Sequence, residues 1–161
     1  MILFVLLASV VLGVDALSKL LSTYYLAEYG VVRVLSGVLE LRLTRNSGMA
    51  LGIMSGNSVA IIVLPLAVMV AGYFLLRRYE RTSFKTVALA LIFGGFLGNF
   101  IERVSRGFVL DMIYFPFMPW FVCNLADVAI CAGVAMLAAS LLFRPKDWRE
   151  KHAKADPSGD E

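Results

Sequence analysis

Four apolar segments constrain the fold of this chain more than any other feature of its sequence. They cover approximately residues 2–26, 59–76, 86–101 and 120–143, and two of them are short. A helix needs about 20 apolar residues to cross the hydrocarbon core of a bilayer, within a range of about 17–25. We therefore predict an all-α membrane protein with four transmembrane helices. Pro65 in the second segment is compatible with this, because neighbouring helices can bond the carbonyl group that it frees.

The composition supports the membrane assignment and excludes several classes of function. Hydrophobic residues make up 60% of the chain and charged residues 17%, whereas soluble domains average roughly 45–50% and about 25%. The basic residues do not form the uniform coat expected for nucleic-acid binding. Cys123, Cys131 and His152 form no cluster, so they indicate neither a metal site nor a disulfide framework. Asp15 interrupts the first segment, which favours a retained helix over a cleaved signal peptide.

Basic residues predict the orientation, because they are denser on one side of the predicted helices. Nine follow the second and fourth segments: Arg77, Arg78, Arg81, Lys85, Arg144, Lys146, Arg149, Lys151 and Lys154. Six are spread over the longer opposite side: Lys19, Arg33, Arg42, Arg45, Arg103 and Arg106. Dense basic residues favour the cytoplasmic side, which places both termini inside. We expect a single membrane domain over residues 1–143 and a tail, residues 144–161, that is basic and then disordered.

The outer connection between the first two helices contains a pattern typical of β-structure. Leu39, Leu41 and Leu43 alternate with polar residues, and a period of two indicates a half-buried strand. Residues 32–35 can pair with this strand as a hairpin through Ser36 and Gly37. We therefore expect a small β-sheet within about residues 31–53, on the outer face of the membrane.

Polar residues gather at the outer ends of the predicted helices, where they are candidates for function. Three pairs are spaced so that both members share a helix face: Asp15 with Lys19, Asn99 with Arg103, and Asn124 with Asp127. Asp111 lies in an apolar run between the third and fourth segments, and Asn46 leads out of the predicted sheet. Gly94 and Gly98 form a GxxxG motif, which allows a neighbouring backbone to approach closely. We predict that these polar side chains meet at one level.

Two neighbouring carboxyl groups can carry out amide hydrolysis without a covalent intermediate. They share one proton, so one can accept a proton from water while the other donates a proton to the substrate. Asp111 and Asp127 are the best candidates, because the short segment between them can fold back. A Ser18–Lys19 dyad is disfavoured, since adjacent residues on a helix do not face each other. The alternative is that the polar residues are only helix caps and ion pairs, as Asp15 and Lys19 can be.

Five motifs resemble those of lipoprotein signal peptidase, also called signal peptidase II, and occur in the family's order. They read Asp15-Ala-Leu-Ser-Lys19, Asn46-Ser-Gly-Met-Ala-Leu-Gly52, Gly94-Gly-Phe-Leu-Gly-Asn-Phe-Ile-Glu-Arg103, Gly107-Phe-Val-Leu-Asp111 and Asn124-Leu-Ala-Asp127. The resemblance extends from Asp15 to about Gly133. The sequence departs from the family at Leu51, where phenylalanine is usual, and at Glu102, where aspartate is usual.

This resemblance implies an aspartic endopeptidase of the bacterial inner membrane. Such an enzyme removes the signal peptide of a prolipoprotein just before a cysteine that carries diacylglycerol, near the outer leaflet. It uses no metal or cofactor and is inhibited by globomycin. The resemblance places the catalytic pair on Asp111 and Asp127. The residues that support this pair or hold the substrate are then Asp15, Lys19, Asn46, Gly48, Asn99, Arg103 and Asn124.

Two other functions remain open from the residues alone. A small ion- or proton-coupled transporter would place its acids near the bilayer midplane, at broken helices. A membrane subunit without enzymatic activity would keep its function when either aspartate is neutralised.

Overall fold

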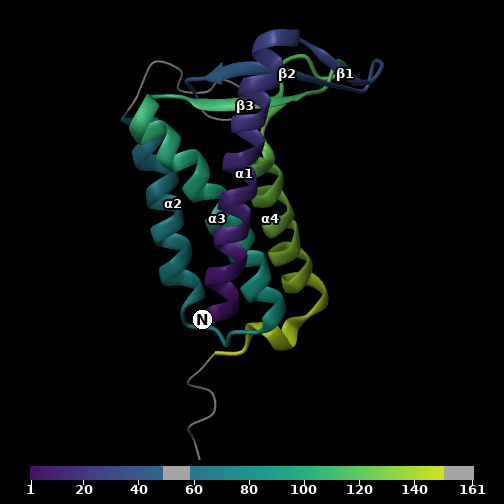
Figure 1. The fold of residues 1–161 in the computed structure, drawn as a ribbon. Helices are drawn as coiled ribbons and strands as arrows, with labels where there is room; N and C mark the ends of the chain where they lie inside the picture. The colour runs from purple at the N-terminus through teal and green to yellow at the C-terminus, as the bar shows by residue number, and fades with distance from the viewer. Residues whose placement is uncertain (49–58, 151–161) are drawn as a thin grey trace, which may run out of the picture.

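The computed structural model describes residues 1–48 and 59–150. Four helices stand side by side, and a small sheet lies across one end of them (Figure 1). The elements are α1 (Ile2–Tyr29), β1 (Val32–Leu35), β2 (Leu39–Asn46), α2 (Ala60–Leu76), α3 (Ser83–Arg106), β3 (Val109–Tyr114), β4 (Val122–Cys123), α4 (Leu125–Phe143) and the 3-10 helix η2 (Pro145–Trp148). Leu51 and the tail from Lys151 onward, for which we made sequence-based predictions, lie outside the described residues.

Three of the helices are long and apolar enough to cross a membrane. These are α1 with 28 residues, α3 with 24 and α4 with 19. The apolar helix α2 has 17 residues, so it is shorter than α4, the shortest of these three. The prediction of a multi-pass membrane protein is thus confirmed, whereas α2 as a fourth span remains a prediction.

The sheet has four antiparallel strands in the order β1-β2-β3-β4. The predicted hairpin is present, with Val32 opposite Leu41 and Leu35 opposite Leu39. Strands β3 and β4 were not predicted: they come from the connection between α3 and α4 and extend the hairpin. As a result, the segment Val109–Tyr114, which we expected to be part of an apolar connection, pairs in register with β2.

The bounds of α3 and α4 differ from those predicted, and local chemistry explains these differences. The fourth helix begins at Leu125 rather than near Trp120, because Val122 and Cys123 belong to β4 and Asn124 caps the helix. The third helix is longer than residues 86–101. The Thr82 side chain caps its start by accepting from a backbone N–H, and Gly107 ends it in the left-handed conformation with φ 76°.

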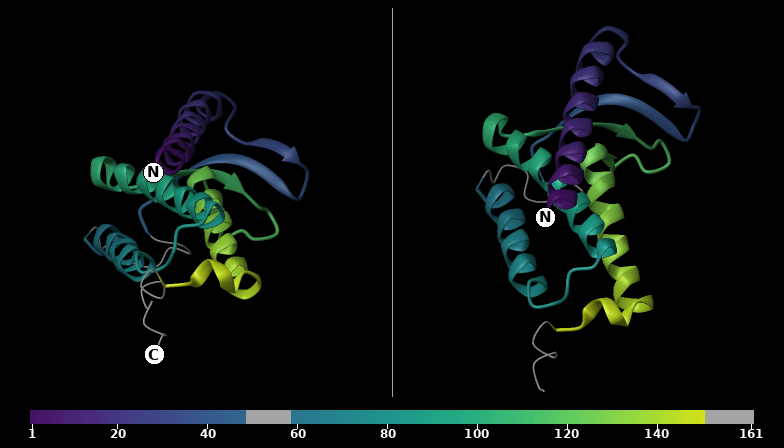
Figure 2. Two further views of the ribbon diagram at one scale, coloured as in Figure 1. Left: turned by 90° about the horizontal axis from the view of Figure 1, so that it is seen from below. Right: turned by 60° about the horizontal axis from the view of Figure 1, so that its bottom comes forward.

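Helix α3 is the centre of the bundle, because glycines let two other helices approach it (Figure 2). A Cβ atom added at Gly94 would lie 2.7 Å from the carbonyl oxygen of Ala8 on α1. One added at Gly95 would lie 2.5 Å from the carbonyl oxygen of Ala126 on α4. The predicted close approach at the GxxxG motif is therefore present. In contrast, α2 lies at the side of α3 and buries only Ile61.

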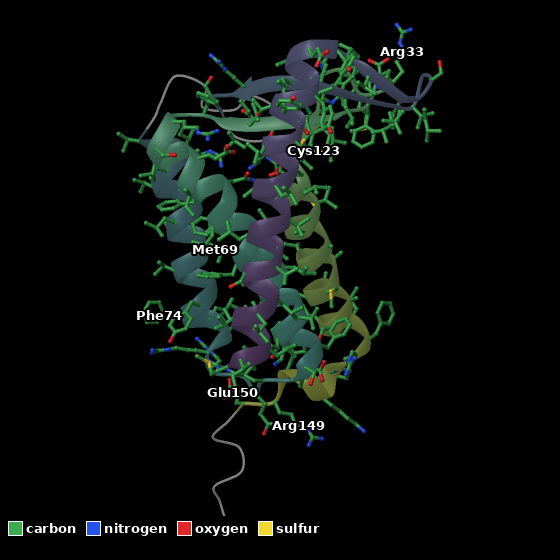
Figure 3. The ribbon with its side chains drawn as sticks, viewed as in Figure 1. Arg33, Met69, Phe74, Cys123, Arg149 and Glu150 are labelled. Carbon is green, nitrogen blue, oxygen red and sulfur yellow. The ribbon has the colours of Figure 1, made fainter. Side chains whose placement is uncertain are left out.

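The end of the bundle opposite the sheet carries the N-terminus and η2 (Figures 1 and 3). Segment η2 is bound to the bundle through buried polar groups: Ser140 donates to the Asp147 carboxylate at 3.2 Å, and Lys85 donates to the Asp147 carbonyl oxygen. Trp148 donates to the Ser140 hydroxyl at 3.2 Å. A polar cluster therefore closes this end of the molecule, at the far end of the helices from the sheet.

Candidate active site

Asp15 and Lys19 lie buried on the inner face of α1, one turn apart. Their Oδ2 and Nζ atoms are 2.8 Å apart, which confirms the predicted pairing. The other carboxylate oxygen, Oδ1, accepts the backbone N–H of Ala126 at 2.9 Å. Because that N–H belongs to the first turn of α4, where such donors lack partners within the helix, Asp15 joins α1 to the start of α4.

Asn99 extends from α3 into the space between α1 and α4. Its Oδ1 accepts from Lys19 at 3.1 Å and from the side chain of Asn124 at 3.1 Å. Its Nδ2 donates to Oδ1 of Asp127 at 2.8 Å. The two acceptor contacts fix which end of the amide faces Asp127. Asn99 therefore presents a donor to one carboxylate of the predicted pair.

Asn124 and Asp127 form a reciprocal cap at the start of α4. The Asn124 side chain accepts the backbone N–H of Asp127 at 2.9 Å, and Oδ2 of Asp127 accepts the backbone N–H of Asn124 at 3.2 Å. A capping box of this kind satisfies two unpaired helix donors at once. Asp127 is consequently held on both oxygens, by its own helix end and by Asn99.

Asp111 reaches the same cluster from the strand β3, where it pairs opposite Thr44 of β2. Its side chain is fully buried, and its Oδ1 accepts from Asn124 at 2.6 Å while its Oδ2 accepts from Asn46 at 2.9 Å. Burial raises the pKa of the Asp111 carboxyl to about 6, and the nearby Asp127 charge raises it as well. The two amide donors and the charge of Lys19 lower this pKa, but burial outweighs them.

Asn46, Gly48 and Arg103 border the cluster on its open side. Asn46 accepts the backbone N–H of Gly48 at 3.0 Å, and an Arg103 Nη atom donates to the Gly48 carbonyl oxygen at 3.3 Å. The buried Nε atom of Arg103 has no hydrogen-bond partner among residues 1–48 and 59–150. Arg103 thus keeps donor capacity next to the two aspartates.

A cavity of about 460 Å³ opens beside this cluster. Asp111 and Asp127 both line it, which brings the two acids predicted from the sequence to one site. Its other described lining residues are Thr44, Arg45, Asn46, Ser47, Gly48, Arg103, Val109, Trp120, Phe121, Val122, Ile130 and Cys131. The walls are mainly apolar, so a water molecule and an amide bond placed between the carboxyl groups would be partly shielded from bulk solvent.

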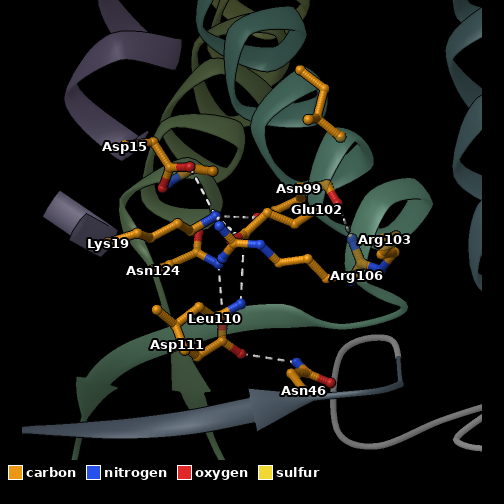
Figure 4. A network of polar contacts seen from close by, with 12 residues as sticks. Asp15, Lys19, Asn46, Asn99, Glu102, Arg103, Arg106, Leu110, Asp111 and Asn124 are labelled. Carbon is orange, nitrogen blue, oxygen red and sulfur yellow. Dashed lines mark hydrogen bonds and ion pairs between the residues drawn. The ribbon is translucent and has the colours of Figure 1, made fainter. Parts of the chain in front are cut away.

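Glu102 is the residue of this cluster that sequence reasoning did not select (Figure 4). Its carboxylate lies 2.8 Å from Lys19 Nζ, and it accepts the backbone N–H of Leu110 at 3.2 Å. Its position three residues after Asn99, on one helix face, was the available signal. The residues predicted from the sequence, Asp15, Lys19, Asn46, Gly48, Asn99, Arg103, Asn124 and both aspartates, join in one network of hydrogen bonds and ion pairs.

The fold and this network define a multi-pass membrane protein in which two acids from different elements share one cavity. Comparison with known proteins gives its family. The family model described as signal peptidase (SPase) II matches residues 7–143. The chain therefore belongs to the signal peptidase II family.

Individual proteins support this assignment over nearly the whole chain. A lipoprotein signal peptidase of Clostridioides difficile (strain 630) is 31% identical over 141 residues, which cover 88% of this chain and 95% of that protein. A lipoprotein signal peptidase of Bacillus pumilus (strain SAFR-032) is 34% identical over 151 residues, with 91% and 97% covered. The fold is also similar to a bacterial membrane enzyme solved by the in meso method, with a TM-score of 0.76, 29% identity and 94% of each chain covered.

Proposed function

We propose that this protein is an aspartic endopeptidase that removes the signal peptide of bacterial prolipoproteins, cutting just before a diacylglyceryl-modified cysteine. The observation that carries the proposal is the meeting of Asp111 and Asp127 at one cavity, each held by the amide-bearing residue Asn124. Family membership supports the peptidase reaction and the prolipoprotein substrate. The geometry of the site supports the residue roles and the aspartic mechanism.

In the first step, the pair activates water. The two carboxyl groups share one proton, and the raised pKa of Asp111, about 6, fits a group that can hold this proton in mildly acidic conditions. The ionised carboxylate takes a proton from the water, whose oxygen forms a bond with the scissile carbonyl carbon. The protonated carboxyl group gives its proton to the carbonyl oxygen, so a neutral gem-diol forms.

In the second step, the bond to the cysteine nitrogen breaks. The carboxyl group that took the proton from water gives it to the leaving nitrogen, and the other carboxylate recovers a proton from a hydroxyl of the gem-diol. The products are a signal peptide with a new carboxyl end and a lipidated cysteine with a free amino group. The pair thereby returns to its starting protonation state.

The same geometry suggests how the substrate is held. Asn46, Gly48 and Arg103 border the cavity. The Nε–H of Arg103, which has no partner within the part of the chain that the structure describes, can bind a carbonyl oxygen of the signal peptide. Asp15 and Lys19 act indirectly: Lys19 fixes Asn99, and Asp15 fixes the first turn of α4. Globomycin would compete for the same cavity.

The location of the site supports this function over ion transport. Asp111 lies on a strand beyond the helix ends, whereas a coupled transporter would place its acids near the bilayer midplane. We place the sheet end of the molecule at the outer leaflet of the inner membrane and both termini in the cytoplasm. A diacylglyceryl cysteine, with its acyl chains in the bilayer, presents its peptide bond at that level.

The decisive experiment tests each aspartate with a matched control. Asp111→Asn and Asp127→Asn should each lower kcat for a diacylglyceryl prolipoprotein at least about 1,000-fold, because neither amide can exchange the proton that the reaction needs. Asp147→Asn alters a buried aspartate at the opposite end of the bundle and should keep turnover within about threefold of the original protein. Cleavage by purified protein in detergent is the measurement. Substantial turnover in either site variant, with the protein still folded, would contradict the assignment.

A further inference from the structure

Glu102 connects three parts of the molecule through one carboxylate. Its Oε2 atom lies 2.8 Å from Lys19 Nζ on α1 and accepts the backbone N–H of Leu110 on β3 at 3.2 Å. Its Oε1 atom pairs with Arg106 at 3.2 Å. The Glu102 side chain is 12% exposed, whereas that of Arg106 is 58% exposed. The two inner contacts are therefore the ones shielded from solvent, where charge-assisted hydrogen bonds are strongest.

Each inner contact leads to one of the two aspartates. Figure 4 labels Leu110 and Asp111 on one route from Glu102, and Lys19 and Asn99 on the other. Leu110 directly precedes Asp111, so the bond to its N–H ties the backbone beside Asp111 to α3. Lys19 donates to Oδ1 of Asn99 at 3.1 Å, and Asn99 in turn donates to Asp127 at 2.8 Å. Glu102 thus stands at the branch point of two short chains of contacts, and the chains end on the two carboxyl groups.

We propose that Glu102 is a positioning residue for the reaction: it fixes the Asp111 backbone and the Lys19 ammonium on the same turn of α3 that carries Asn99, and so sets the separation of the two carboxyl groups. This inference rests on the proposed function. Glu102 touches neither the cavity nor the substrate, so it acts entirely through Leu110, Lys19 and Asn99.

Loss of the Glu102 charge would disturb both chains together. Lys19 would keep Asp15 as its only carboxylate partner among the described residues and would move toward it, away from Asn99. The backbone N–H of Leu110 would keep only a neutral acceptor. A displacement of about 1 Å at reacting groups can lower a rate about 100-fold without changing substrate affinity. The expected signature is therefore a fall in kcat at nearly constant KM.

The test compares Glu102→Gln with Glu102→Asp in the prolipoprotein cleavage assay. Glu102→Gln keeps the shape but removes the charge, and should lower kcat about 10- to 100-fold with KM within about twofold. Glu102→Asp keeps the charge and should retain at least about a third of the original kcat. Arg106→Gln removes only the exposed partner, so kcat should stay within about twofold of the original.

Two further variants separate the possible failures. Ser140→Ala removes a buried hydrogen bond at the opposite end of the bundle, so it shows what lost stability alone does to kcat. An unchanged kcat in Glu102→Gln would overturn the inference. A fall in kcat that, per degree of lost Tm, is no larger than in Ser140→Ala would also overturn it. If Asp111→Asn keeps its turnover, the proposed function itself fails. If Asp111→Asn is inactive while Glu102→Gln is fully active, only the role of Glu102 is wrong.

Discussion

Asn124 is the residue at which both carboxyl groups of the site converge. Its side chain donates to Asp111 at 2.6 Å and accepts the backbone N–H of Asp127 at 2.9 Å. Only an amide combines an acceptor and two donors on a side chain this short. A carboxylate at this position could still cap the helix, but it would place a third negative charge against Asp111. The same side chain therefore begins α4 and orients the site.

The raised pKa of Asp111 predicts how the rate depends on pH. As the pH rises through about 6, the free enzyme loses the proton that the pair must share, so kcat/KM should fall toward alkaline pH. Bound substrate excludes water and raises the carboxyl pKa further, so the matching fall in kcat should occur at higher pH. Measurement of both constants from about pH 5 to 9 tests this. A kcat/KM that stays constant over this range would contradict it, and Asp147→Asn, which lies far from the site, should leave the profile unchanged.

At the scale of helices, the contacts of α3 with α4 depend on glycines on both. An added Cβ would lie 2.5 Å from the Ala126 carbonyl oxygen at Gly95 and 2.5 Å from the Ala88 carbonyl oxygen at Gly133. Both contacts are with backbone, which cannot turn aside as a side chain can. The helix pair must therefore separate to accept either methyl group.

We expect Gly95→Ala and Gly133→Ala each to lower the free energy of unfolding by about 1–3 kcal/mol. Gly72→Ala, on α2, is the matched control, because nothing lies within 4 Å of its added Cβ. It should be neutral or stabilising by up to about 1 kcal/mol, as alanine is the better helix former. Thermal unfolding in detergent measures all three. Equal stability of Gly95→Ala and Gly72→Ala would show that the close approach is unimportant.

The elements that could be predicted from sequence are those with a clear period. Alternation revealed β2, and spacings of three or four identified which polar side chains share a helix face. Strand β3 was not predicted because Val109, Leu110, Asp111 and Met112 are all buried. Both faces of the strand are covered there, so its sequence shows no alternation of apolar and polar residues. Glu102 was not predicted as a site residue because only the tertiary fold brings its partners, Lys19 and Leu110, to it.

At the scale of the whole molecule, charge and topology agree with the proposed orientation. The N-terminus, the link between α2 and α3, and η2 lie at one end, while the sheet lies at the other (Figure 1). The described basic residues of the first end include Arg77, Arg78, Arg81, Lys85, Arg144, Lys146 and Arg149. Such residues prefer the cytoplasmic side, so the site would face outward.

Exposed positions at the two ends allow a direct test of this orientation. Arg33→Cys, on β1, should react with a membrane-impermeant thiol reagent in intact cells. Arg149→Cys, beside η2, should react only after the cells are permeabilised. Both residues are exposed, so access to the compartment should decide the outcome. The unsubstituted protein, which contains Cys123 and Cys131, gives the background, and the opposite labelling pattern would invert the assignment.

The placement of Asp111 on a strand limits where the chain can accept insertions and deletions. Side chains alternate between the two faces of a strand, so a shift of one residue would turn the carboxyl group to the opposite face. Gly107 ends α3, and β3 begins two residues later at Val109. A single-residue insertion or deletion between Gly107 and Asp111 should therefore be as damaging as loss of the aspartate. An insertion within residues 115–119, which connect β3 to the cavity-lining Trp120, should be tolerated better.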